Sequence, residues 1–135
     1  MKKPVWIEER DALVLHSRLL ALHGGTVGLR DRGLLQSALA RHQQQYAHFE
    51  VSDIIDMATA YTAGIVRNHP FLDGNKRTGF VVGILFLELN GYRFAASEEN
   101  AAQAVLKLAD GTLDEADYRS FLRGNMVRKK IPITP

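Results

Sequence analysis

The chain contains no cysteine among its 135 residues, which excludes disulfide bonds, thiolate nucleophiles and thiolate metal ligands. It also lacks a long hydrophobic run. The longest apolar stretch, from Gly79 to Leu87, is far shorter than the roughly 20 residues that a membrane-spanning helix needs. Charged residues at positions 8–11 interrupt the amino-terminal segment before a signal peptide could form. We therefore expect a cytoplasmic protein without a membrane partner.

An excess of one charge is also missing. Lysine and arginine total 17 against 15 acidic residues, and the net charge of +2 is spread along the chain. This distribution argues against direct binding of nucleic acid, which usually requires a concentrated basic surface. The hydrophobic fraction of 46% is enough for one core. We expect a single domain over residues 1–135, with an irregular tail from about residue 125.

Apolar residues recur at helical spacing along most of the chain, and capping residues mark the ends of these segments. The segment from about 75 to 90 is apolar on nearly every side, which is typical of a central, surrounded helix. The sequence thus predicts an all-α fold, a compact bundle of about six helices around a buried central helix, with at most a small β-hairpin. The six expected helices cover residues 8–22, 32–41, 53–68, 75–90, 98–109 and 115–123, the last end being approximate. Ser52 or Asp53 is the expected cap of the third helix, which ends at Asn68, and a capping box at 112–115 begins the last. A polar loop is expected at 42–50 and an extended piece at 92–94.

Two cations lie where a helix normally disfavours them. Lys76 and Arg77 follow a polar loop and fall in the first turn of the apolar helix, where unpaired N–H groups and the helix dipole already supply positive charge. Gly74 lies beside them and allows close approach of the backbone to a ligand. Cations, glycine and free amides together indicate an anion site, and phosphate is the usual occupant.

The same loop offers a metal ligand and a base. Asp73 is its only carboxylate, and one carboxylate with phosphate oxygens and water is the ordinary way in which Mg²⁺ is held at a nucleotide. His69 can accept a proton from an alcohol near neutral pH. Taken singly, His69 is more often a structural histidine, and Asp73-Gly74 is a common turn pair. Their clustering at the start of an apolar helix is what favours a site for phosphoryl or nucleotidyl transfer.

Residues 69–77, His-Pro-Phe-Leu-Asp-Gly-Asn-Lys-Arg, resemble the signature of the Fic/Doc family, and Asn-Lys-Arg-Thr resembles its Doc (death-on-curing) branch. Gly24-Gly25 and residues 28–39 are similar to the amino-terminal part of Doc proteins, so the resemblance covers about residues 24–94. It implies a helical fold in which the polar segment at about 41–50 forms a flap for the target peptide. It also implies a role for each residue of the loop: His69 as general base towards a protein hydroxyl, Asp73 as the Mg²⁺ ligand, and Gly74, Asn75, Lys76 and Arg77 as nucleotide-binding residues.

Two positions distinguish this chain from the adenylyl-transferring members of the family that it resembles. Lys76 replaces the second glycine of their signature, and Phe80 replaces its last arginine. In Doc-like members this change accompanies a kinase activity that uses the γ-phosphate of ATP. Gly74, however, is the Fic-like residue where the best-known Doc protein has alanine, so transfer of AMP or UMP stays open.

The inhibitory motif Ser/Thr-x-x-x-Glu-Gly/Asn of many Fic proteins does not occur in the chain. By resemblance this suggests a toxin that is restrained by a separate cognate antitoxin, with a translation factor as target and elongation factor Tu as the first candidate. A third interpretation is a non-catalytic binding module or co-repressor that keeps the fold for partner contact.

Overall fold

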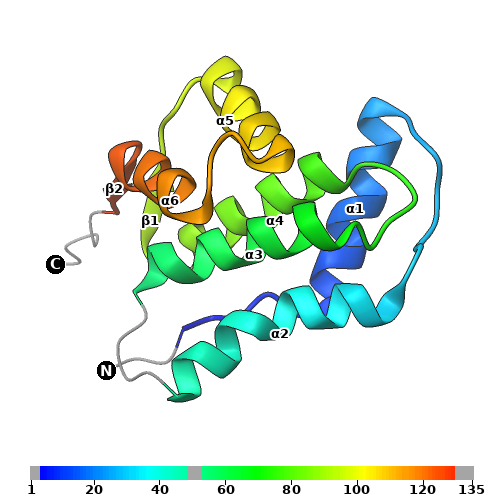
Figure 1. Cartoon of the computed structure of the whole chain (residues 1–135), viewed down its shortest axis with the longest axis horizontal. Coiled ribbons are helices and arrows are strands. Elements are labelled where there is room, and N and C mark those ends of the chain that lie inside the picture. Colours follow the sequence, from blue (N-terminus) through cyan, green and yellow to red (C-terminus); the bar gives the residue numbers. More distant parts are fainter. Residues whose placement is uncertain (1–3, 49–52, 130–135) are drawn as a thin grey trace, which may run out of the picture.

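The computed structural model describes residues 4–48 and 53–129. Within this part the chain forms six helices and one pair of short strands (Figure 1), which confirms the all-α class. Ser52, one of the two predicted caps, and residues 130–135 lie outside the described residues. The elements are α1 (Glu9–His23), α2 (Arg32–His48), α3 (Ile54–Asn68), α4 (Asn75–Leu89), β1 (Tyr92–Phe94), α5 (Glu98–Asp110), α6 (Glu115–Gly124) and β2 (Met126–Arg128).

Helix α3 is the most enclosed element of the bundle. Every residue from 57 to 66 is buried, and α2, α4, α5 and α6 all pack against it. Figure 1 shows α3 lying between α2 and α4. The surrounded helix that we expected at 75–90 is α4, which is buried on the side facing α3, whereas Phe80, Val81 and Ile84 are only partly buried. Phe80 and Ile84 pack at the edge of the core, and this outer face of α4 is only partly covered by the rest of the described chain.

The contact between α3 and α4 is unusually close because α4 carries glycine at two positions one turn apart. A Cβ atom at Gly79 would lie 3.2 Å from the carbonyl oxygen of Thr62, and one at Gly83 would lie 2.3 Å from the Thr62 hydroxyl. The Thr62 hydroxyl also donates a hydrogen bond of 2.8 Å to the carbonyl of Gly79. These contacts fix the position of α4 against α3, and with it the position of the loop between them.

The segment at 42–50 is not the predicted polar loop. Helix α2 continues to His48, because the sequence Arg-His-Gln-Gln-Gln-Tyr-Ala-His contains neither proline nor glycine to end it. Polarity alone was the wrong criterion, since one face of a surface helix is polar too. The expected flap is therefore helical through residue 48, and residues 49 and 50 lie outside the described residues.

The only sheet in the described residues pairs β1 with β2 in antiparallel register, with Tyr92 opposite Arg128 and Phe94 opposite Met126. This confirms the extended piece at 92–94, but the tail is not irregular at 126–128, because it pairs with β1.

The capping box of α6 is also shifted from the prediction. Asp114 is the N-cap and Asp117 completes the box. None of the described helices is long and apolar enough to cross a membrane.

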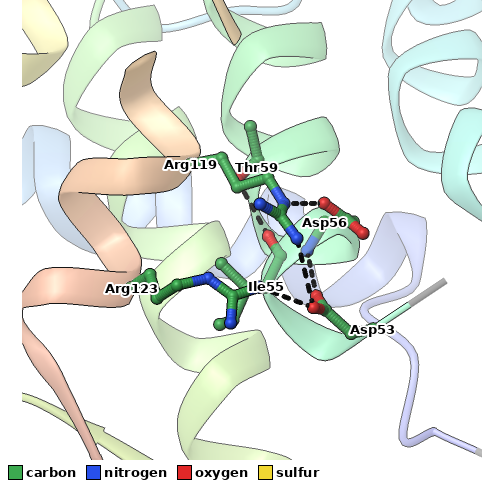
Figure 2. A network of polar contacts seen from close by, with 6 residues as sticks. All are labelled: Asp53, Ile55, Asp56, Thr59, Arg119 and Arg123. Atoms are coloured by element: carbon green, nitrogen blue, oxygen red, sulfur yellow. Dashed lines mark hydrogen bonds and ion pairs between the residues drawn. The ribbon is translucent and has the colours of Figure 1, made fainter. Parts of the chain in front are cut away.

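An ionic network fastens α6 to the first turn of α3 (Figure 2). Arg119 bonds Asp56, and both Arg119 and Arg123 bond Asp53, at 3.3 and 2.9 Å. Asp53 also accepts a hydrogen bond of 2.8 Å from the N–H of Asp56, so it caps the helix. The network therefore holds the beginning of α3, whereas the loop that carries the predicted site follows its end.

Candidate functional site

The loop at 69–74 reverses the chain between α3 and α4. His69 caps α3 in a left-handed conformation, with φ 51° and ψ 54°, and its N–H donates to the carbonyl of Ile65 at 3.1 Å. It is the only non-glycine residue with positive φ in the described part of the chain, and such a conformation concentrates at functional sites. Gly74, with φ 77°, then precedes α4 as its N-cap. The end of one helix and the start of the next thus meet at one place.

Residues 29 and 30, between α1 and α2, hold this loop through backbone and side-chain contacts. Leu29 forms a β-bridge with Phe71, and the N–H of Arg30 donates to the carbonyl of Pro70 at 2.7 Å. The guanidinium of Arg30 donates to two more carbonyls, those of His69 at 2.6 Å and Asn68 at 2.8 Å. These carbonyls end α3 and carry its negative partial charge, which the arginine offsets.

The first turn of α4 presents amides without a protein partner. The N–H of Thr78 returns to the carbonyl of Gly74 at 2.9 Å, and Gly74 provides no side-chain cap. Within the described residues, the N–H groups of Asn75, Lys76 and Arg77 donate no hydrogen bond. Three donors and the positive end of the helix dipole therefore face one place, as an anion site requires.

Lys76 and Arg77 are exposed at this helix start, and both line the groove described below. Neither forms an ion pair with any residue that the structure describes. Two unpaired cations beside three unpaired amides strengthen the attraction for an anion with several negative charges.

The carboxylate of Asp73 is held beside the amide end of α4. One oxygen accepts from the N–H of Gly74 at 2.8 Å, and the other accepts from the N–H of Thr26 at 3.1 Å. Gly25 allows this approach, because a Cβ atom there would lie 2.8 Å from the second oxygen. Each oxygen keeps a lone pair, since a carboxylate oxygen can accept two hydrogen bonds.

This donor set fits Mg²⁺ held together with a nucleotide. The described residues contain no group of three or more His, Asp or Glu side chains that could hold a metal alone. Mg²⁺ usually takes one or two carboxylates and completes its shell with phosphate oxygens and water. Asp73 is exposed and lies beside the anion site, so it could supply that single protein ligand.

Asn75 connects the base candidate to the loop. Its amide oxygen accepts from the N–H of Phe71 at 2.9 Å, and its nitrogen donates to the carbonyl of Phe71 at 2.9 Å. The same nitrogen lies 3.1 Å from Nδ1 of His69. The peptide groups of Phe71 fix the orientation of the amide, so Nδ1 is the acceptor and a neutral imidazole carries its proton on Nε2.

Asn75 is 4% exposed, and its side chain is occupied by Phe71 and His69. A contact from this residue to a phosphate would therefore come from its backbone N–H, which the sequence pattern could not distinguish from a side-chain contact.

All six predicted site residues line one groove of about 810 Å³, which is within the size range of small-molecule sites. One end of the groove is polar and carries the loop. Its walls are the outer face of α4, with Phe80, Val81 and Ile84, and the facing residues of α5, with Ala102 and Leu106. The apolar outer face of α4 therefore forms one wall of this groove, and α5 faces it from the other side.

Three supporting residues were not identified as part of the site from the sequence. Arg30, Thr26 and His16 contact the loop from positions 39 to 57 residues away. In the sequence, Gly24-Gly25 and residues 28–39 indicate only a similarity to Doc proteins. No periodicity or spacing within the sequence links such distant positions, because the contacts depend on how α1 and the segment between α1 and α2 pack against the loop.

The chain is similar to known proteins over the segments that build this site. A model of the Fic/DOC family matches residues 6–87. "Protein kinase doc" of Escherichia phage P1 is 29% identical over 117 residues, which cover 87% of this chain and 92% of that protein. "Toxin Doc" of Mycolicibacterium smegmatis (strain ATCC 700084 / mc(2)155) is 40% identical over 74 residues, which cover 54% of this chain and 57% of that protein. The chain belongs to the Fic/DOC family, and its relatives place it in the Doc toxin branch.

Proposed function

We propose that this protein is a toxin-like transferase that moves the γ-phosphate of ATP to a serine or threonine hydroxyl of another protein. The observation that carries the proposal is the convergence of His69, Asp73 and three unpaired amides of α4 at the polar end of one groove. The phage relative is named a protein kinase, which supports phosphate transfer to a protein.

In the proposed reaction the hydroxyl oxygen of the target forms a bond to the γ-phosphorus, and the bond from that phosphorus to the bridging oxygen of ADP breaks. The proton of the hydroxyl passes to the imidazole of His69, and ADP leaves with the electron pair. In the tautomer described above the lone pair that can accept this proton is on Nδ1, so the hydroxyl would displace the amide nitrogen of Asn75 and deliver its proton there.

The charge that develops on the phosphate oxygens would be met by the amides of Asn75, Lys76 and Arg77 and by the two cationic side chains. Asp73 would hold Mg²⁺, which supplies charge neutralisation between phosphate oxygens when it is bound. The carboxylate is already oriented by Thr26 and Gly74. The protein's part in this chemistry is therefore positioning and electrostatic stabilisation.

The alternative is transfer of AMP or UMP to the same kind of hydroxyl. Two groove residues favour the kinase. Lys76 carries a long cationic side chain where a second glycine would leave room for phosphate, and Phe80 belongs to the apolar wall, where its ring makes an edge contact with Phe94 at 5.7 Å. No arginine of α4 is therefore available at that position for the terminal phosphates. Gly74 keeps the alternative open.

Isotope labelling distinguishes the two transfers. The purified protein is incubated with cell extract, Mg²⁺ and ATP labelled at either the α or the γ position, with His69→Ala as the control. The kinase proposal predicts γ label on a target protein and none with the variant. Label from the α position would establish nucleotidyl transfer instead.

We further propose that the target is a translation factor, with elongation factor Tu as first candidate, and that a cognate antitoxin restrains the protein in the cytoplasm. The mycobacterial relative is named a toxin, which supports the antitoxin in this proposal. Expression of the wild type should arrest growth, and expression of His69→Ala should not. Equal effects of the two would favour a non-catalytic binding module or co-repressor.

A further inference from the structure

His16 is a buried histidine that the proposed reaction does not use. It lies on α1 and is 5% exposed. Its ring is stacked on Phe71, with centroids 3.7 Å apart and planes inclined by 9°. Its Nε2 lies 2.8 Å from the carbonyl oxygen of Asp73. A carbonyl can only accept, so Nε2 carries a proton and donates.

This hydrogen bond fixes one particular peptide group, the one between Asp73 and Gly74. Its carbonyl is held by His16 on one side, and its N–H donates to the Asp73 carboxylate at 2.8 Å on the other. The imidazole also packs against Gly74, since a Cβ atom at Gly74 would be 3.8 Å from Nε2 of His16. The orientation of this peptide therefore sets the direction of the carboxylate.

Without a donor the same peptide could turn over. Rotation of a peptide plane changes ψ of the preceding residue and φ of the following one, and glycine accepts either sign of φ at little cost. The carbonyl would lose its partner at the buried ring, and an unpaired carbonyl is costly away from water. Donors without a protein partner in the described chain lie in the next turn, the amides of the start of α4 that form the anion site.

We propose that His16 is a positioning residue that locks the Asp73–Gly74 peptide, so that the carboxylate points to the metal position and the carbonyl stays out of the phosphate position. This inference rests on the proposed function. His16 touches neither substrate nor metal, and it acts through the orientation of this one peptide. Loss of its donor should weaken binding of the magnesium nucleotide by about tenfold or more, as for other partners that orient a metal ligand.

Three variants separate the donor from the shape of the ring. His16→Phe keeps a planar ring on Phe71 but has no donor. His16→Gln places an amide N–H near the position of Nε2, and His16→Asn carries the same amide too short to reach it. Phosphotransfer is measured over a range of ATP and Mg²⁺ concentrations, with thermal unfolding as the control for folding.

We expect His16→Phe and His16→Asn to raise the KM for magnesium ATP and the Mg²⁺ requirement by about tenfold, with a smaller change in kcat, and His16→Gln to restore values near wild type. Wild-type behaviour of His16→Phe, or equal loss in all three variants, would overturn the proposal. If His16→Phe does not fold, the comparison of Gln with Asn decides, because these two differ only in reach.

A second readout does not depend on catalysis. The same variants are made in the His69→Ala background, and binding of a non-hydrolysable ATP analogue with Mg²⁺ is measured by calorimetry. Weaker binding with Phe and Asn but not with Gln supports the proposal, and equal binding in all variants contradicts it. If the wild type transfers no label at all, the proposed function fails, and this arm still tests the role of His16.

Discussion

At the scale of single residues, the site depends on where side chains are absent as much as on where they are present. The Asp73 carboxylate reaches the N–H of Thr26 only because Gly25, with φ 132°, has no Cβ. Gly24 next to it also has positive φ, at 79°, but nothing lies within 4 Å of its Cβ position. The two glycines therefore differ in their contacts with the site and share the same kind of backbone requirement.

We expect Gly25→Ala to lose most transfer activity and to raise the Mg²⁺ requirement, because the methyl group would displace the carboxylate. Gly24→Ala is the matched control. Each alanine should cost about 1–3 kcal/mol of stability through its positive φ, but only the first should change the Mg²⁺ dependence. Titration of activity with Mg²⁺, alongside thermal unfolding, tests this, and an equal Mg²⁺ requirement in both variants would contradict it.

At the scale of elements, the position of the loop follows from how closely α4 lies on α3. Gly83 faces the Thr62 hydroxyl and the carbonyl of Ala58, so a larger residue would force the helices apart. Gly124, the last residue of α6, has nothing within 4 Å of its Cβ position. One glycine is therefore needed for packing, and the other is not.

Gly83→Ala should destabilise the protein by about 1–3 kcal/mol, the usual cost of an overpacked core. Gly124→Ala should be neutral or stabilise by up to about 1 kcal/mol, because alanine is the better helix former. Chemical denaturation of the two variants measures both values. A stable Gly83→Ala protein would show that the two helices can move apart freely.

The ionic network at the start of α3 offers a test of whether the two ends of that helix are independent. Arg119 is about one-third exposed, like its partners, so each ion pair should contribute about 1 kcal/mol or less. Arg119→Met should lower the melting temperature slightly, less so at high salt, and leave the KM for ATP unchanged. A changed KM would show that the network acts on the site.

At the scale of the whole molecule, the sequence predicted the helices well where local signals mark them. The side chains of Asp53 and Ser97 cap α3 and α5, which is a local feature, and both helices lie within one or two residues of the expected ends. The predicted end of α2 was wrong because polarity does not distinguish a helix from a loop. The prediction of an irregular tail was wrong at 126–128 because strand pairing joins residues 32 to 36 positions apart.

In the site, too, local features could be predicted from the sequence and contacts between distant residues could not. Residues 69–77 are contiguous, so their clustering was visible in the sequence. The contacts of Arg30 and His16 and the wall formed by α5 depend on tertiary packing. That wall can be tested directly, because α5 carries two exposed alanines of which only Ala102 lines the groove, whereas Ala109 does not.

Ala102→Trp should fill the groove and weaken binding of an ATP analogue by at least about tenfold, or about 1.4 kcal/mol. Ala109→Trp should bind like the wild type. Calorimetry with Mg²⁺ and the analogue compares the two, and their thermal unfolding shows whether both remain folded. Equal binding would mean that the nucleotide does not pass along α5.

The groove has one further consequence for how the protein is made. Its two walls come from α4 and α5, and the supports of the loop come from α1 and the segment before α2. A nascent chain on the ribosome that has not yet extended past Glu98 carries the histidine, the carboxylate and the amides but only one side of the groove. The complete groove, and any binding that needs both of its walls, should therefore arise only in molecules whose synthesis has passed α5.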